Sequence, residues 1–178
     1  PGSQCQKSTV NLEVDHSRRL KIMTNHTITH MMNRALRICV NAQADQKGSL
    51  VDDEKTRFDF SHNAAMTVEQ IAQVEKVVND DIAADLPVYY ADAPQEEART
   101  INGLRAVFGE KYPPRVRIVS IGVPVGDLLA HPTNPRWAKF SIEFCGGTHL
   151  AKTGDAERFV IISEEAVAKG IRRITAIT

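Results

Sequence analysis

Two short motifs far apart in the chain constrain the fold more than any other feature, because each carries two side chains that can bind a metal ion. His26 and His30 stand four residues apart, and so do Cys145 and His149. On an α-helix, residues four apart lie on one face, and the glycine pair between Cys145 and His149 allows a tight turn that brings both side chains to a common point. Imidazole and thiolate suit zinc better than magnesium or calcium. On spacing alone, a four-ligand zinc site and surface histidines beside a glycine turn are equal alternatives.

The segment from Met23 to Val40 has the periodicity of an amphipathic helix. Its apolar residues recur at a spacing of three and four: Ile28, Met32, Ala35, Leu36 and Cys39. At about 100° per residue, His26 and His30 lie on the face opposite this apolar stripe. We therefore expect a helix that packs its apolar side into the core and presents both imidazoles to a different surface.

The rest of the pattern predicts strands that mostly follow one another without alternating βαβ units. Strands are expected at Arg57–Phe60, Val88–Tyr90, Val116–Ile121, Ser141–Phe144, Phe159–Ile162 and Ile171–Ile177. Helices are expected from a capping box at Thr67–Gln70 up to Pro87, at Pro94–Ala98 and at Ser163–Lys169, with loops at Gln43–Ser49 and Pro124–Pro135. This order favours an α+β fold, with mixed or antiparallel sheets packed with helices, over a doubly wound sheet.

Composition limits the setting and the partners of the chain. Its 178 residues are 42% hydrophobic, enough for one compact domain or two small lobes, and 22 basic residues balance 22 acidic ones. Neutral net charge does not by itself indicate nucleic-acid binding, so any RNA contact must depend on local patches. Three widely spaced cysteines are a poor disulfide framework, and no apolar run approaches a membrane span. We predict a cytoplasmic protein with no membrane contact, and we interpret Pro1-Gly2-Ser3 as a cloning scar.

Five blocks of sequence, in order along the chain, resemble the editing domain of alanyl-tRNA synthetases. They are Asn25–His30, Gln46–Val51, Arg57–His62, Phe144–His149 and Gly170–Ile174, within a match from about Val14 to Thr178. The editing domain of threonyl-tRNA synthetases shares the zinc pairs, but the Arg57–His62 block and the Gly-Gly-Thr spacer look like the alanyl type. One departure is the stretch Val125–Lys139, an insertion similar to that of eukaryotic cytosolic members, which we interpret as a surface excursion rather than a substrate lid.

The resemblance implies a fold, a cofactor and an activity. The fold is a two-part α+β domain over residues 4–178, built around a zinc-containing cleft. The cofactor is one Zn²⁺ held by His26, His30, Cys145 and His149. The activity is hydrolysis of the ester of tRNA(Ala) mischarged with serine or glycine, and the remainder of the parent synthetase, including its aminoacylation domain, is an expected partner outside this chain.

Polar residues near the metal are the candidate substrate contacts. A pocket for alanine rejects glycine and serine weakly, since one small group is worth only about 1–3 kcal/mol, so a second hydrolytic site is needed. We expect Gln46 and Cys145 to be catalytic, with Gln46 also contacting the substrate. The serine hydroxyl would be recognised by Ser49 or Thr27, unless these serve only as a turn residue and a helix N-terminal residue.

Two questions stay open at the level of sequence. Arg57 and Asp59 project to one side of a strand, either as a structural ion pair or as part of the cleft lining. Four protein ligands complete a tetrahedron, which is typical of a structural zinc site, whereas a catalytic zinc keeps a position for water. Zinc therefore either activates a water or positions the substrate while a tRNA hydroxyl assists the water.

The tRNA contacts are expected from a basic cluster near the end of the chain, Lys169, Arg172 and Arg173, with Arg34 and Arg37 towards the histidine side of the first helix. Two other functions remain alternatives to a synthetase segment: a free-standing trans-editing deacylase, and a zinc-stabilised tRNA-binding module without hydrolysis.

Overall fold

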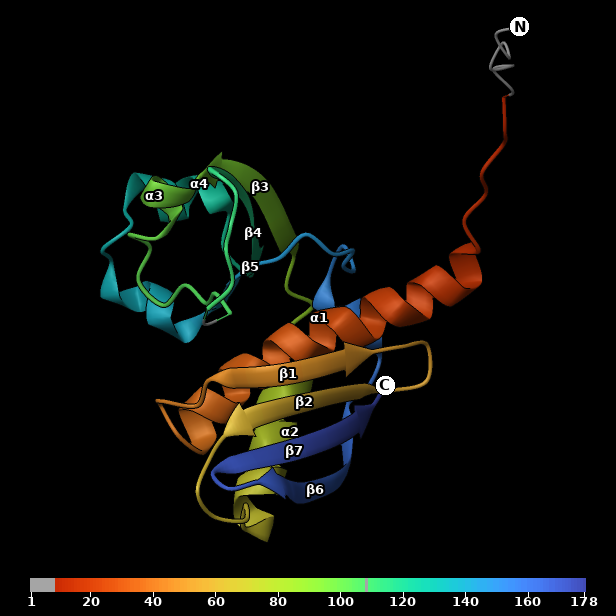
Figure 1. Cartoon of the computed structure of the whole chain (residues 1–178), viewed down its shortest axis with the longest axis vertical. Helices are drawn as coiled ribbons and strands as arrows, with labels where there is room; N and C mark the ends of the chain where they lie inside the picture. Colours follow the sequence, from red (N-terminus) through yellow and green to blue (C-terminus); the bar gives the residue numbers. More distant parts are fainter. Residues whose placement is uncertain (1–8, 108) are drawn as a thin grey trace, which may run out of the picture.

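The computed structural model describes residues 9–107 and 109–178 and shows an α+β fold. A long helix, α1 (His16–Cys39), runs between two separate antiparallel sheets, one on each side of it (Figure 1). This arrangement confirms the predicted fold class. The interpretation of Pro1-Gly2-Ser3 concerns residues that lie outside the described part of the chain.

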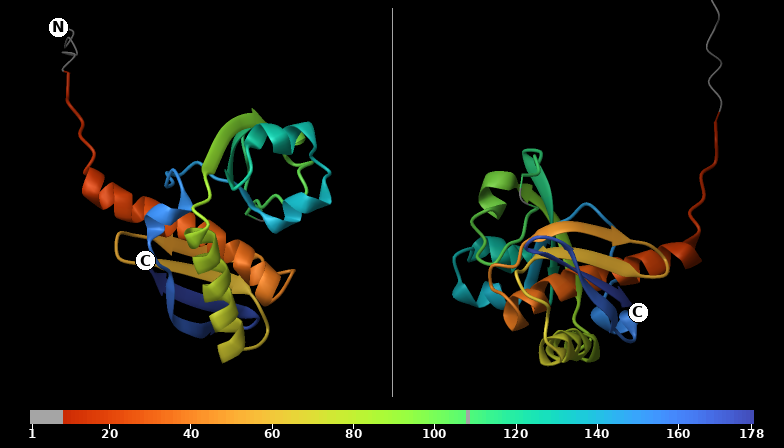
Figure 2. Two further views of the ribbon diagram at one scale, coloured as in Figure 1. Left: turned by 180° about the vertical axis from the view of Figure 1, so that it is seen from behind. Right: turned by 60° about the horizontal axis from the view of Figure 1, so that its bottom comes forward.

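The first lobe is a four-stranded antiparallel sheet in the order β1-β2-β7-β6. Its strands are β1 (Gln46–Val51), β2 (Thr56–Ser61), β6 (Val160–Ala168) and β7 (Ile171–Ile177). One face of the sheet is covered by α1 and by α2 (Val68–Ala83), as the view from behind shows (Figure 2). Phe58 and Phe60 of β2 point into the core between sheet and helices and are 1% and 0% exposed.

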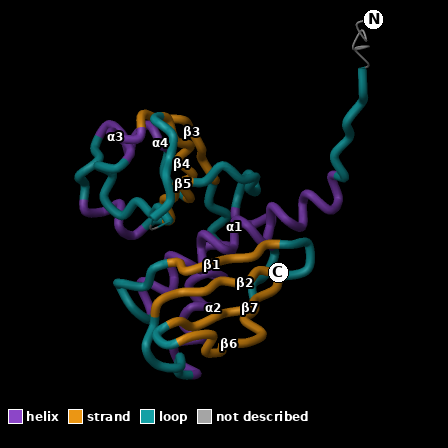
Figure 3. Tube along the Cα trace, viewed as in Figure 1, coloured by secondary structure: helices purple, strands orange, loops and turns teal. Residues whose placement is uncertain are grey.

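The second lobe is a smaller sheet in the order β3-β4-β5, surrounded by short helices and loops (Figure 3). Its elements are β3 (Val88–Pro94), α3 (Gln95–Ala98), β4 (Arg115–Ile121), α4 (Val125–Ala130), the 3-10 helix η1 (Pro135–Lys139) and β5 (Ser141–Phe144). A second 3-10 helix, η2 (Thr153–Ala156), leads the chain back to the first lobe.

Helix α1 connects the two lobes and begins seven residues before the predicted Met23. Asp15 caps it by accepting a hydrogen bond from the Arg18 amide, a local signal at its N-terminus. Its apolar stripe enters the core of the first lobe, as predicted, and the opposite face is buried as well, because it lies against the second lobe. None of the helices among residues 9–107 and 109–178 is long and apolar enough to cross a membrane.

Three predictions of local structure were wrong. Gln46–Ser49 is not a loop but the start of the edge strand β1, where a bulge between Gln46 and Gly48 weakens the alternation that marks a strand. Ser163–Lys169 has the Glu, Ala and Lys content of a helix, yet all of it but Lys169 lies within β6, because pairing with β7 overrides local helix propensity. The region Pro124–Pro135 contains α4 rather than loop alone.

The stretch Val125–Lys139 is also not merely a surface excursion. Val125 and Leu128 are 4% and 0% exposed and belong to the core of the second lobe. Trp137 packs against the same core, and its indole N–H donates to the carbonyl of His131 at 2.7 Å. These contacts make the stretch a structural part of that lobe.

Candidate metal centre

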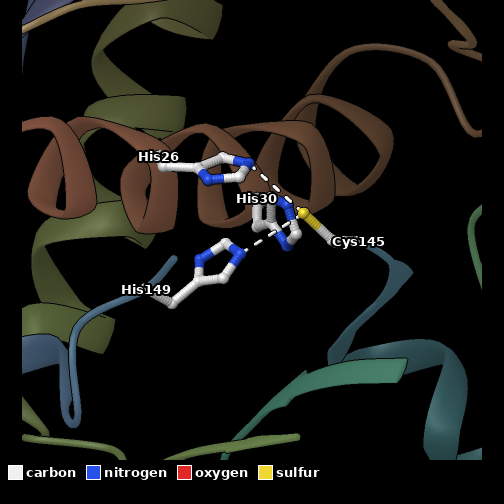
Figure 4. A group of neighbouring side chains, drawn as sticks. All are labelled: His26, His30, Cys145 and His149. Atoms are coloured by element: carbon white, nitrogen blue, oxygen red, sulfur yellow. Dashed lines mark hydrogen bonds between the residues drawn. The ribbon is translucent and has the colours of Figure 1, made fainter. Parts of the chain in front are cut away.

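The fold brings together the four side chains of the two motifs at the junction of α1 and the segment that follows β5. One ligand atom from each of His26, His30, Cys145 and His149 lies within 4.8 Å of the other three. The thiol Sγ of Cys145 is 3.4 Å from Nε2 of His26 and 3.4 Å from Nε2 of His149 (Figure 4). The structure therefore confirms that the two distant pairs converge on one point.

The turn between Cys145 and His149 is shaped by close contacts that only glycine allows. A Cβ on Gly147 would lie 2.3 Å from Cε1 of His26, whereas a Cβ on Gly146 would meet nothing within 4 Å. The Gly147 amide points at Sγ of Cys145 at 3.4 Å, and the Arg117 guanidinium donates to the carbonyl of Gly147 at 3.2 Å. The turn is thus held between α1 and β4.

Outer hydrogen bonds fix which nitrogen of two histidines faces the centre. Nδ1 of His26 lies 3.2 Å from the carbonyl of Thr148, and Nδ1 of His149 lies 3.2 Å from the hydroxyl of Thr27. When Nδ1 carries the proton in each of these bonds, the lone pair on Nε2 is directed at the cluster. The residues that complete these pairs are positioning residues for the metal ligands.

Burial keeps these histidines neutral, which is the form that binds a metal. It lowers the pKa of His149 to about 3 and that of His30 well below its usual range. Burial also raises the pKa of the Cys145 thiol. Nδ1 of His30 is buried and has no hydrogen-bond partner among the described residues. Three neutral imidazoles, one of them with an unpaired buried nitrogen, and one thiol fit a zinc ion.

We expect zinc binding to release about one proton per ion at pH 7. The proton comes from Cys145, because its raised pKa keeps the thiol protonated while zinc binds the thiolate; the histidines, with lowered pKa values, have none to give. Zinc titration by calorimetry in buffers of different ionisation enthalpy measures this number. Release of two or more protons would contradict the neutral state of the imidazoles.

A cavity of about 150 Å³ adjoins the cluster on the side of β1. His26, His30 and Cys145 line it, and so do Gln46 and Ser49 from β1. The Gln46 amide donates to the Ser49 hydroxyl at 3.0 Å. The two predicted substrate contacts of β1 therefore lie in the same cavity as the cluster and are hydrogen-bonded to each other.

Thr27 lies elsewhere. Its side chain is fully buried, and its hydroxyl accepts the Leu150 amide at 3.0 Å in addition to its contact with His149. It does not line the cavity. In the structure its hydroxyl positions His149, one of the four candidate metal ligands.

The basic cluster near the end of the chain does not form one surface. Arg172 and Arg173 are adjacent in β7, so their side chains leave opposite faces of the sheet. Arg172 makes a two-pronged ion pair with Glu164 at 2.5 and 2.6 Å, and Arg173 makes one with Asp59 at 2.7 and 2.8 Å. Asp59 is thus paired with Arg173 rather than with Arg57. Contacts of these arginines and Lys169 with tRNA stay a prediction.

Sequence reasoning missed Glu143, a buried carboxylate in the wall of the cavity. Its Oε1 accepts from the Asn33 amide at 2.8 Å, and its Oε2 lies 3.6 Å from Nε2 of His30. Burial raises the pKa of Glu143 to about 8. An ionisable residue between the apolar Ile142 and Phe144, in the strand before Cys145, was the signal in the sequence that could have revealed it.

Comparisons with known proteins relate the chain to tRNA synthetases. Residues 116–175 match the family described as the threonyl and alanyl tRNA synthetase second additional domain. Over nearly its full length the chain is similar to alanine–tRNA ligases, which confirms the predicted relationship to their editing domain.

Three relatives show the extent of this similarity. The mitochondrial alanine–tRNA ligase of Saccharomyces cerevisiae is 53% identical over 92% of the chain, and the cytoplasmic one of Dictyostelium discoideum 52% over 95%. The alanine–tRNA ligase of Candida albicans is 57% identical over 92% of the chain. The chain spans only 17% to 18% of the length of these relatives.

Proposed function

We propose that this chain, over residues 4–178, is an editing domain that hydrolyses the ester of tRNA(Ala) mischarged with serine or glycine. The observation that carries the proposal is the cavity of about 150 Å³ that joins the four-ligand cluster to Gln46 and Ser49. The similarity to alanine–tRNA ligases supports the choice of tRNA. The remainder of a parent synthetase and mischarged tRNA(Ala) are the proposed partners.

The size of the cavity suits a small amino acid. Ligand sites for drug-sized molecules span about 300–1,000 Å³, so a volume of about 150 Å³ favours side chains such as those of glycine and serine. Selection of serine over alanine then requires a polar group that forms a hydrogen bond with the serine hydroxyl, because shape alone separates such substrates weakly.

Ser49 and Gln46 supply that polar group in the proposal. Because the Gln46 amide donates to the Ser49 hydroxyl oxygen, the Ser49 O–H is left as a donor at the cavity wall. It can meet the hydroxyl of a bound serine, while the amide carbonyl of Gln46 orients the substrate or the attacking water.

His26, His30, Cys145 and His149 would hold a zinc ion beside the scissile ester. Bound zinc supplies positive charge that stabilises the developing negative charge on the ester oxygen. The chain's own residues keep this site ready, since Thr27 and the Thr148 carbonyl fix the imidazoles and Glu143 stands against His30. In this proposal Cys145 acts as a ligand to the ion.

We also propose a cytoplasmic setting, as for the Dictyostelium relative. A relative named mitochondrial is equally similar, so tagged full-length protein in cells is the measurement that decides between the two compartments.

The test is deacylation of seryl-tRNA(Ala) by this chain, with alanyl-tRNA(Ala) as the control substrate. We expect the seryl species to be cleaved and the alanyl species to be spared. Cys145→Ala should lower the rate at least about 100-fold, because it removes a metal ligand. Cys39→Ala is the matched control, since Cys39 is a partly buried free cysteine at the end of α1, away from the cavity. A wild-type chain that binds zinc and tRNA(Ala) but cleaves nothing would show a binding module instead.

A further inference from the structure

The cavity of about 150 Å³ beside the four-ligand cluster is called the metal cavity below. A second cavity, of about 330 Å³, lies next to it where the end of α1 faces the second lobe. The two cavities share three lining residues, Arg37, Arg105 and Glu143. The second cavity adds Arg34 and the Phe140 ring to its wall. Three arginines and one buried carboxyl group, that of Glu143, thus surround a space larger than the metal cavity.

Arg34 and Arg37 differ in how many hydrogen-bond and ion-pair partners they already have. Arg34 is committed, because it donates to the carbonyl of Lys139 and pairs with Asp81. Arg37 has a side chain only 19% exposed, and its nearest carboxylate oxygen, on Asp45, is 3.9 Å away. Nε of Arg37 is buried with no hydrogen-bond partner among the described residues. Arg37 therefore has unused donors at the junction of the two cavities.

Arg105 is held at the same junction by its backbone. Its amide donates to the carbonyl of Ile142 at 2.8 Å, and its carbonyl accepts the Phe144 amide at 2.9 Å. This pairing forms a parallel bridge between Arg105 and Glu143, so both side chains leave the same face of the second sheet. The position of Arg105 is thus set by β5, the strand that leads directly to Cys145.

We propose that Arg37 and Arg105 bind the phosphodiester that precedes the 3′-terminal nucleoside of an RNA whose aminoacyl ester occupies the metal cavity. This inference rests on the proposed function. The ester, the terminal ribose and that phosphate are covalently consecutive, so an anion site for the phosphate must adjoin the aminoacyl cavity. Arginine is suited to it, because its guanidinium presents several donors in a fixed plane to phosphate oxygens.

The volume and the lining of the second cavity agree with this assignment. It is about twice as large as the metal cavity, as expected if it receives nucleoside and phosphate rather than an amino acid. Phe140 offers an aromatic face, and aromatic rings commonly stack on the bases of single-stranded RNA ends. By contrast, a cavity at the other end of α1 is lined by four acidic residues and only one basic residue, Lys21, so its net negative charge opposes phosphate binding; the acidic residues are Asp53, Glu54, Asp155 and Glu157.

The test measures binding of an uncharged RNA minihelix with a CCA end, so it does not depend on hydrolysis. Two changes remove the same contact from either side: Arg105→Gln in the protein, and a neutral methylphosphonate at the last linkage of the RNA. Each should weaken binding about tenfold, and the two together should weaken it by clearly less than the product of the separate effects, because in Arg105→Gln only the Arg37 contact is left for the methylphosphonate to remove. Arg105→Gln should also reduce the slope of log affinity against log salt by about 0.7.

Arg136→Gln is the matched control, because Arg136 is an exposed arginine of η1 that lines neither cavity. Its salt slope and its response to methylphosphonate should equal those of the wild type. Zinc content and the circular dichroism spectrum show whether each variant is folded, and Arg37→Lys serves as a second variant if Arg105→Gln fails this check.

Three outcomes would overturn the inference: unchanged affinity of Arg105→Gln, additive losses from the two changes, or no saturable binding of the minihelix. Failure of the proposed function looks different. If Arg105→Gln and the methylphosphonate show the coupled loss in binding but the wild-type chain never cleaves seryl-tRNA(Ala), the phosphate site stands and the hydrolase assignment is wrong.

Discussion

Gly147→Ala is expected to lower the affinity of the chain for zinc about 100-fold. The new Cβ would lie 2.3 Å from Cε1 and 2.7 Å from Nδ1 of His26, far inside van der Waals contact. The imidazole is the part that must move, and moving it breaks its hydrogen bond to Thr148 and removes Nε2 from the cluster. Structural zinc sites bind with about 10–16 kcal/mol, so one ligand of four corresponds to about 3 kcal/mol, or about 100-fold.

Gly146→Ala is the control for this change, because it adds the same methyl group one residue earlier where nothing lies within 4 Å. Competition with a chelator of known zinc affinity measures both variants. Deacylation of seryl-tRNA(Ala) should fall with zinc affinity in Gly147→Ala and stay near wild type in Gly146→Ala. Equal zinc affinities for the two variants would show that His26 can shift without leaving the metal.

The metal ligands were predictable because their signal is local. Four-residue spacing on a helix aligns His26 with His30, and a glycine turn returns His149 towards Cys145. The tertiary fold had only to bring these two locally ordered pairs together. Few other arrangements use both pairs at once.

The other walls of the cavity were not predictable in this way. Glu143 and Arg105 become neighbours through one bridge between a loop and β5, and both meet Arg37 only because α1 lies between the lobes. No periodicity in the sequence records a contact of this kind. Burial decides which polar residues matter here, and burial depends on how the second lobe docks on α1.

Strand geometry explains the arginines near the end of the chain. Arg172 and Arg173 look like one basic patch in the sequence, but adjacent residues of a strand face opposite sides of its sheet. The prediction of a helix at Ser163–Lys169 concealed the partner of Arg172, since Glu164 comes within reach only when that segment is the strand β6. An error in one element thus changed the interpretation of another.

Gly103→Ala is expected to destabilise the chain by about 3–5 kcal/mol, near the upper end for single substitutions. Gly103 has a φ of 82°, where any side chain costs about 1–2 kcal/mol. Its Cβ would also lie 2.7 Å from Cα and 3.0 Å from the amide nitrogen of Ala138, both backbone atoms of η1. Backbone cannot rotate away as a side chain can, so η1 must separate from the loop that leads to Arg105.

Gly109→Ala separates the two contributions, because Gly109 has the same φ of 82° but a Cβ there would meet nothing within 4 Å. It should lose only the conformational part, about 1–2 kcal/mol. Chemical denaturation of the zinc-loaded chain, followed by circular dichroism, gives both free energies of unfolding. If the two variants lose equal stability, the contact between Gly103 and η1 does not contribute to the free energy of unfolding. In that case Val125–Lys139 does not support the wall of the second cavity. A larger loss in Gly103→Ala, with weaker binding of the CCA minihelix, is the expected result, because Ala138 and Arg105 line the same second cavity.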